Sequence, residues 1–308
     1  MNSPAQGAEH ADRDTGRARR GLGIFLVLVV AGSAPLLYLI VGSGSPIREL
    51  PQYVLPLMWM PAIASVGTRL VTGEGFADLS FKLRERRILL VVGLAIGFPI
   101  AVGLIAYGIA WGSGIVSFTP PAETASPILA FVSQLIFAGT LGAAVGVISA
   151  AGEEIGWRGY MIPRMVEGDI PAPFLVGGIL WGLWHAPAIL TGQYAAGSNR
   201  LLSAGLFIVL AVALTVLWSI WTLETGSIWP AIVGHAAWNA IIQGPFDMFS
   251  SGQLSTTLVG ESGILVIVTS ILIVILLVSR RLPNGVSAAA GFSYRPDEPP
   301  TASTARRD

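Results

Sequence analysis

The chain has 308 residues, of which 53% are hydrophobic and only 12% are charged. Soluble domains carry about 25% charged residues, so these charges are too few to cover a soluble surface of this size. The net charge is zero and there is no cysteine. Nothing therefore favours nucleic-acid binding, and disulfides, thiolate metal sites and cysteine nucleophiles are excluded.

Eight apolar stretches follow one another along the chain, most of them near the length of about 20 residues that crosses a bilayer as a helix. They cover residues 21–43, 52–68, 88–111, 130–163, 172–191, 201–223, 226–246 and 262–279. The pattern predicts an all-α membrane protein of about eight transmembrane helices, with its membrane domain over 21–281. The polar ends are predicted to be tails, residues 1–20 and a disordered segment over 282–308.

Basic residues are distributed unevenly between the connections, which predicts the orientation. They gather before the first stretch, between residues 69 and 87, and after the last stretch at Arg280 and Arg281, whereas the alternate connections hold only Arg48 and Arg200. Both termini are therefore predicted to be cytoplasmic. Lys82 is the only lysine among 18 basic residues, which is typical of a bacterial genome rich in G and C. We expect a bacterial plasma-membrane protein embedded in the lipid bilayer.

Ionisable side chains inside apolar stretches are costly and mark functional sites. Here they occupy the fourth, fifth and seventh stretches: Glu153, Glu154 and Arg158, then His185, then His235 with the amide Asn239. Counted from the turn near Ile170, Glu153 and His185 are 17 and 15 residues away. Equal distances from a turn mean similar heights in a helical hairpin. The groups are predicted to converge on one buried pocket that opens to the cytoplasmic side.

Three motifs in these stretches resemble those of one protein family. Glu153-Glu-Ile-Gly-Trp-Arg158 matches the EExxxR motif of the CAAX-protease and bacteriocin-processing family, also called CPBP or Abi. Trp181-Gly-Leu-Trp-His185 is similar to its F/W-xxx-H motif, and His235-Ala-Ala-Trp-Asn239 to its H-xxx-N motif. They follow in the family's order within residues 130–245. The resemblance implies an intramembrane endopeptidase, a hydrolase of membrane-associated peptides or proteins, with its catalytic pocket between helices four, five and seven.

The resemblance also implies roles for these residues. Glu153 would activate a water molecule, and His185 would orient that water or protonate the leaving amine. His235 and Asn239 would donate hydrogen bonds to the oxyanion of the tetrahedral intermediate. Glu154 and Arg158 are four residues apart, so they are predicted to pair and to brace the catalytic glutamate.

Other interpretations remain open. The family is often labelled a metalloprotease, and a zinc ion would have Glu153, His185 and His235 as its ligands. Because the HExxH pattern is absent, we favour chemistry that needs no metal. The buried ion pair could serve only to fix helix packing, and an inactive scaffold or immunity protein would carry the same residues. A small-solute transporter fits less well, because the first three stretches contain no counterpart of the polar groups.

Overall fold

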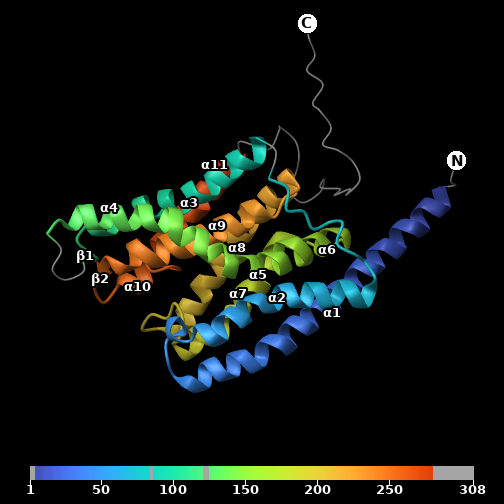
Figure 1. Cartoon of the computed structure of the whole chain (residues 1–308), viewed down its shortest axis with the longest axis horizontal. Helices are drawn as coiled ribbons and strands as arrows, with labels where there is room; N and C mark the ends of the chain where they lie inside the picture. Colours follow the sequence, from blue (N-terminus) through green and yellow to red (C-terminus); the bar gives the residue numbers. More distant parts are fainter. Residues whose placement is uncertain (1–3, 84–85, 121–124, 280–308) are drawn as a thin grey trace, which may run out of the picture.

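The computed structural model describes residues 4–83, 86–120 and 125–279, with the backbone alone for residues 4–13. Its helices run nearly parallel or antiparallel to the long axis of the molecule (Figure 1). The first half contains α1 (Pro4–Ser43), the 3₁₀ turn η1 (Ile47–Glu49), α2 (Pro51–Thr72) and α3 (Arg86–Gly112). The second half contains α7 (Pro173–Thr191), α8 (Arg200–Thr225), α9 (Trp229–Ile241), the π-helical turn η4 (Ile242–Phe246), α10 (Ser255–Leu258) and α11 (Ile264–Ser279).

One long helical segment between these halves carries the first motif. It consists of α4 (Pro127–Phe137), the π-helical turn η2 (Ala138–Gly142), α5 (Ala143–Gly156), a second π-helical turn η3 (Trp157–Met161) and α6 (Ile162–Glu167). π-helical turns insert an extra residue into a helix and are frequent at functional sites. Here η3 begins at Trp157, three residues after Glu154, so Arg158 lies on a widened turn.

The predicted all-α membrane protein is confirmed. Within the described residues, six helical segments are long and apolar enough to cross a membrane: Asp14–Ser43, Pro51–Thr72, Arg86–Gly112, Pro127–Glu167, Pro173–Thr191 and Arg200–Thr225. The seventh and eighth predicted spans are also helical, but α9 has 13 residues and α11 has 16. The count of eight spans therefore stays a prediction. The only strands in the described part, β1 (Ser117–Phe118) and β2 (Ser250–Ser251), form a short antiparallel pair.

The N-terminal segment, residues 1–20, was predicted to be a polar tail, and most of it is helical. Residues 4–20 are already helical and continue into the first span as α1. Arg19 donates from Nε to the carbonyl oxygen of Gly168 at 2.7 Å, and Ala18 is buried. The cause is that helix propagation costs little once a stable helix exists, a factor that composition alone does not report. The predicted C-terminal tail, 282–308, lies outside the described residues.

Small residues allow the helices that carry the motifs to approach closely. A Cβ atom at Gly178 or Gly182 of α7 would lie 2.5 or 2.8 Å from a Cα atom of α8, so the two helices pack backbone against backbone. On α5, a Cβ atom at Gly156 would lie 2.3 Å from Pro61 of α2. The glycine face of α7 is therefore an interhelical contact, as small-residue faces are in membrane proteins.

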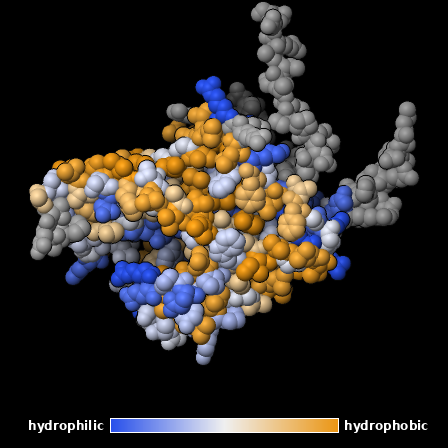
Figure 2. All heavy atoms as spheres, viewed as in Figure 1, coloured by the Kyte–Doolittle hydropathy of each residue, from blue (hydrophilic) through white to orange (hydrophobic). Residues whose placement is uncertain are grey.

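The two ends of the bundle differ in charge. The end that we call the arginine end contains Arg19, Arg69, Arg87 and Arg164, and there Arg164 pairs with Asp78 at 3.0 Å. The opposite end, which we call the loop end, contains residues 192–199 and 247–263 with β1, β2 and α10 (Figure 1). Between the ends, apolar side chains cover much of the visible surface (Figure 2), as expected for a surface that faces lipid.

Candidate active site

The first motif forms a buried ion pair on the widened turn of η3. Arg158 donates from Nη1 to Glu154 Oε1 at 2.9 Å, and both side chains are at most 1% exposed. The other terminal nitrogen of Arg158 donates to Thr215 Oγ1 on α8 at 2.9 Å. The guanidinium carbon also lies 4.3 Å from the ring centre of Trp181, which adds a cation–π contact. The ion pair predicted from the four-residue spacing is therefore present, and it connects α5 to α7 and α8.

Glu153 is placed differently from its neighbour. Its Oε2 accepts a hydrogen bond from Trp181 Nε1 at 2.8 Å, and the residue is 1% exposed. Among the described residues it makes no ion pair with an arginine or lysine. Adjacent helical residues point about 100° apart, so one carboxylate faces the guanidinium while the other faces the indole. Glu154 thus has a charged partner, Arg158, and Glu153 has a neutral one, Trp181.

His235 contacts the glutamate that the sequence assigned to Arg158 alone. Its Nδ1 lies 2.8 Å from Glu154 Oε1, and its ring stacks on Trp218 with 5.3 Å between centres and an interplanar angle of 16°. An ionised carboxylate only accepts hydrogen bonds, so Nδ1 carries the proton. Periodicity places residues on a helix face but does not say which neighbouring helix that face meets, which explains why this contact was not predicted.

His185 is oriented in the same way by a different acceptor. Its Nδ1 lies 2.9 Å from the backbone carbonyl oxygen of Trp181, and a carbonyl only accepts. The ring therefore carries its proton on Nδ1 when neutral, which leaves Nε2 with a free lone pair. Phe207 and Tyr194 flank the ring, with ring centres 4.7 and 5.8 Å away. Both motif histidines thus have Nδ1 engaged and Nε2 available.

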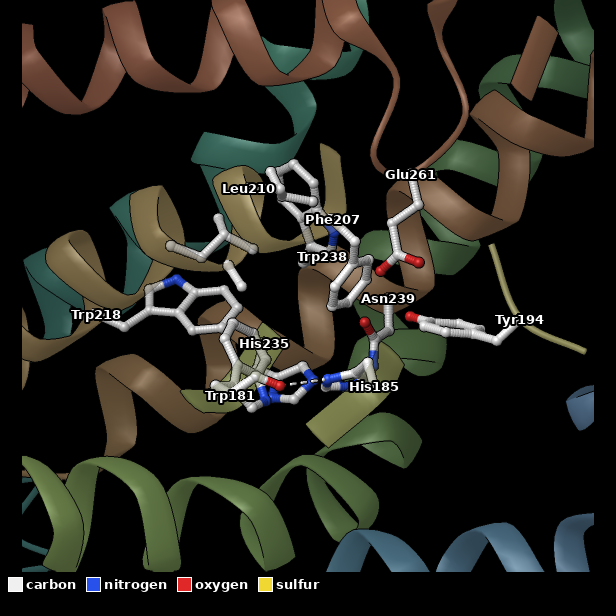
Figure 3. A pocket seen from close by; sticks show the side chains of 12 residues that line it. Trp181, His185, Tyr194, Phe207, Leu210, Trp218, His235, Trp238, Asn239 and Glu261 are labelled. Atoms are coloured by element: carbon white, nitrogen blue, oxygen red, sulfur yellow. Dashed lines mark hydrogen bonds between the residues drawn. The ribbon is translucent and has the colours of Figure 1, made fainter. Parts of the chain in front are cut away.

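A small cavity lies between these groups (Figure 3). Its free space of about 10 Å³ is close to what one water molecule requires. His185, His235 and Asn239 line it, and so does Trp181. Glu153 does not line it but accepts a hydrogen bond from that Trp181 ring. The remaining lining residues are Tyr194, Phe207, Leu210, Ala211, Leu214, Trp218, Trp238 and Glu261. The structure thus brings two histidines and the amide of the predicted site to one enclosed space.

The cavity lies toward the loop end, not toward the arginine end. Tyr194 and Glu261, which border it, belong to the loop end, and the surface is hollowed between α10 and the segment joining α7 to α8 (Figure 2). Toward the arginine end, the fully buried rings of Trp157 and Trp221 fill the interior. Glu153 and His185 were predicted to lie at similar heights, and His185 lines the cavity while Glu153 is bonded to its wall residue Trp181. The predicted opening to the cytoplasmic side stays a prediction, because it depends on how the bundle is oriented in the membrane.

Three polar residues of the cavity region were missed in the sequence. Tyr194 and Glu261 lie in connections, and Gln243 lies four residues after Asn239. Gln243 Nε2 is 2.8 Å from Glu261 Oε1 and 3.2 Å from Asn239 Oδ1. Glu261 is only 7% exposed although it is charged. One signal was available, because Glu261 immediately precedes the last apolar stretch and Gln243 continues the helical face of the third motif.

The described residues do not form a metal site. Nowhere in 4–83, 86–120 and 125–279 do three His, Asp or Glu side chains group closely enough to hold a metal ion. Of the predicted zinc ligands, Glu153 is bonded to the indole of Trp181 and does not line the cavity that His185 and His235 line. These donors do not fit the geometry of a zinc centre, so no step of the mechanism below uses a metal.

Fold and site together define a class: a helical integral membrane protein with buried carboxylates, histidines and an amide around a water-sized cavity. Residues 128–241 match the family described as type II CAAX prenyl endopeptidase Rce1-like. The matched segment contains all three motifs, so the predicted resemblance to the CAAX proteases is confirmed over these residues. The match supports the type of enzyme that the motifs predicted, a membrane-embedded CAAX endopeptidase. No curated protein matched the chain.

Proposed function

We propose that the protein hydrolyses peptide bonds of a membrane-associated peptide or protein, with water activated by Glu153. The observation that carries the proposal is the water-sized cavity lined by His185, His235 and Asn239, whose wall residue Trp181 is bonded to that glutamate. A protease of this kind needs a nucleophilic water, a base and donors for the oxyanion. The cavity is large enough for the water and is lined by candidate donors, and Glu153, bonded to its wall residue Trp181, is the candidate base.

The different hydrogen-bond partners of the two glutamates support Glu153 as the base. Glu154 accepts from both Arg158 and His235 through one oxygen. Arginine keeps its charge even when buried. Arg158 therefore holds Glu154 in a structural ion pair. Glu153 accepts only from the neutral indole of Trp181. It is therefore the carboxylate that is free to take a proton from water.

His185 completes the movement of the proton. Its Nε2 has a lone pair that can accept a proton, because the ring proton is on Nδ1, which donates to the backbone carbonyl oxygen of Trp181. Glu153 takes a proton from water while the water oxygen bonds to the carbonyl carbon of the substrate. The C–N bond then breaks, and the amine nitrogen receives the proton through His185. The proton count balances, with one water consumed for each bond cut.

Asn239 and His235 serve the oxyanion in this scheme. A side-chain amide donates from its NH₂ group without any change of protonation, whereas His235 has to carry both ring protons to donate from Nε2. The Glu154 carboxylate beside Nδ1 is the group that balances the charge of such a ring. One oxyanion donor contributes about 2.7–4 kcal/mol in other hydrolases.

The substrate class follows from the family description and from the position of the cavity. The matched family is described as cutting prenylated CAAX ends, and the cavity is enclosed by membrane helices. A peptide with a lipid or an apolar segment in the bilayer would reach it most easily. Peptide maturation, bacteriocin immunity and protein turnover are all consistent with this class.

The test uses purified full-length protein in lipid nanodiscs and an internally quenched, farnesylated peptide that ends in a CAAX sequence. Cleavage by the wild type should be lost in Glu153→Gln and kept in Glu49→Gln, which makes the same change at an exposed position. The membrane peptidomes of cells carrying each variant should differ in the same way. Equal peptidomes and equal cleavage for the wild type and Glu153→Gln would refute the proposal.

A further inference from the structure

A chain of three polar side chains leads from the loop end to the oxyanion pocket. Gln243 is its central member, and its Nε2 lies 2.8 Å from Glu261 Oε1 and 3.2 Å from Asn239 Oδ1. A longer contact of 3.4 Å reaches the hydroxyl oxygen of Tyr194. Figure 3 shows the carboxylate of Glu261 directed toward the same space as the amide of Asn239. Asn239 and Glu261 line the cavity, and of the three residues only Asn239 has a part in the mechanism above.

The direction of these hydrogen bonds is set at the carboxylate. Glu261 Oε1 accepts from Gln243 Nε2 at 2.8 Å, so Gln243 presents its NH₂ group and not its carbonyl oxygen to Glu261. The second hydrogen of the same NH₂ group then meets Asn239, which has to present its carbonyl oxygen. The NH₂ group of Asn239 is thereby turned the other way. Amide orientations are ambiguous in isolation, but here the charge at one end removes the ambiguity.

The backbone around Glu261 holds the carboxylate in place. A Cβ atom at Gly263 would lie 2.5 Å from backbone atoms of Leu258 and Val259, and one at Gly260 would lie 2.8 Å from the backbone of Thr256. Only glycine fits such close approaches. The turn between α10 and α11 is therefore tightly packed, and it fixes the carboxylate that starts the chain.

The end of α9 places Gln243 between its two partners. Asn239 and Gln243 are four residues apart on one helical face, and η4 widens the helix from residue 242 onward. Gly244 has non-helical angles of φ −83° and ψ −114°, and Pro245 follows it. The helix is thus interrupted just after Gln243, so this side chain is the last on that face before the chain leaves the bundle.

We propose that Gln243 and Glu261 are positioning residues that turn the NH₂ group of Asn239 toward the cavity as the oxyanion donor. The inference rests on the proposed function, because the cavity has to bind an oxyanion for the orientation to matter. A reversed amide would direct the carbonyl oxygen, with its partial negative charge, at the developing oxyanion. The chemistry of the site therefore depends on a carboxylate that does not itself touch the substrate.

Replacement of Gln243 by Glu reverses the polarity while keeping the shape. A glutamate at this position accepts only, so Asn239 has to turn its NH₂ group away from the cavity. Because Gln243→Glu also sets two carboxylates side by side, the double variant Gln243→Glu/Glu261→Gln is the main test. It keeps one charge in the pair and still requires the reversed Asn239. Gln253→Glu, at an exposed position, is the matched control.

The first readout needs no substrate. The chain has four asparagines, Asn2, Asn199, Asn239 and Asn284, so selective ¹⁵N labelling of their side chains gives a spectrum that Asn239→Ala assigns. In the wild type the Asn239 NH₂ signal should exchange with water. In the double variant it should move downfield and exchange more slowly, since it now donates to a carboxylate. An identical Asn239 signal in the two proteins would overturn the proposal.

The second readout separates this inference from the proposed function. With the quenched farnesylated peptide, the double variant should lose about 10²–10³-fold in kcat, as when an oxyanion donor is removed, with KM and thermal stability unchanged. Asn239→Ala should lose a similar factor. If the Asn239 NH₂ signal changes as expected but cleavage remains at the wild-type rate, the orientation is correct and the oxyanion role of Asn239 is wrong. If cleavage falls while the Asn239 NH₂ signal stays as in the wild type, the positioning role of Gln243 and Glu261 is wrong.

Discussion

Trp181 donates its indole N–H to Glu153 at 2.8 Å, and this single hydrogen bond joins the second motif to the first. The backbone carbonyl oxygen of the same residue accepts from His185. One tryptophan therefore orients both the proposed base and the histidine beside it. The ring also covers Arg158, so its bulk contributes to packing independently of the N–H group.

Replacement of Trp181 by Phe separates these two contributions. Phenylalanine keeps an aromatic ring against Arg158 but removes the donor to Glu153. A hydrogen bond to a charged group contributes about 1.5–3 kcal/mol, so kcat/KM should fall at least tenfold. Thermal stability in detergent should change less than in Trp181→Ala, which also loses the packing. An unchanged kcat/KM in Trp181→Phe would mean that the N–H group does not orient the base.

The two glutamates should differ in stability as well as activity. Arg158→Ala leaves the buried Glu154 carboxylate without its partner, which can cost about 3–5 kcal/mol. We expect Arg158→Ala and Glu154→Gln to lower the melting temperature in detergent and also the activity. Glu153→Gln should abolish cleavage with stability unchanged or improved. The reverse pattern, a stable inactive Glu154→Gln and an unstable Glu153→Gln, would show that the two roles are exchanged.

Buried charge is rare in membrane helices, which is why the sequence singles these residues out. Once the apolar stretches were delimited, Glu153, His185 and His235 stood out, and their spacing gave the Glu154–Arg158 pair. Contacts between helices were harder to predict. The bond between His235 and Glu154 depends on how α9 rotates against α5, which the repeat along either helix does not determine.

The polar residues of the loop end were not predicted from the sequence for a second reason. Glu261 lies in a connection, where a charged residue is ordinarily solvated and carries no signal. It is buried only because α10 and the glycine turn fold over the cavity. The opening of the cavity was likewise set by side-chain volume, with Trp157 and Trp221 closing the other end. Such packing follows from three-dimensional neighbours and not from periodicity.

Metal content is tested directly on the isolated protein. We expect elemental analysis to find zinc well below one atom per chain, and activity to survive dialysis against a strong chelator. His235→Ala should leave the metal content unchanged. Stoichiometric zinc that disappears in His235→Ala would show that the side chains rearrange into a metal centre, and it would replace the metal-free mechanism.

Membrane orientation can be read by cysteine labelling, since the chain has no cysteine of its own. Arg87 at the arginine end and Arg200 at the loop end are both exposed. If the arginine end is cytoplasmic, a membrane-impermeant maleimide added to intact cells should label Arg200→Cys and not Arg87→Cys. Permeabilised cells should label both. Labelling of Arg87→Cys alone would reverse the orientation and place the cavity opening on the cytoplasmic side.

Asp247 predicts how stability depends on pH at the loop end. It follows η4 directly, and burial raises the pKa of its carboxyl from 3.8 to about 7. The titratable groups that face it are Glu261, whose charge raises the pKa further, and Tyr107, whose hydroxyl donates to it at 2.5 Å and opposes the rise. The folded protein thus binds this proton more tightly than the unfolded chain does. Its contribution to stability is complete below about pH 4 and is lost as the pH rises through about 7.

Replacement by Asn removes this titration while keeping a polar group of the same shape. The melting temperature of the wild type should fall relative to that of Asp247→Asn between pH 4 and pH 7, and the difference should become constant above about pH 8. Asp169→Asn, which makes the same change of charge at an exposed position, is the control. A difference between wild type and Asp247→Asn that stays constant across this range would mean that the carboxyl titrates alike in the folded and unfolded chains. In that case its burial beside Glu261 would not have shifted its pKa.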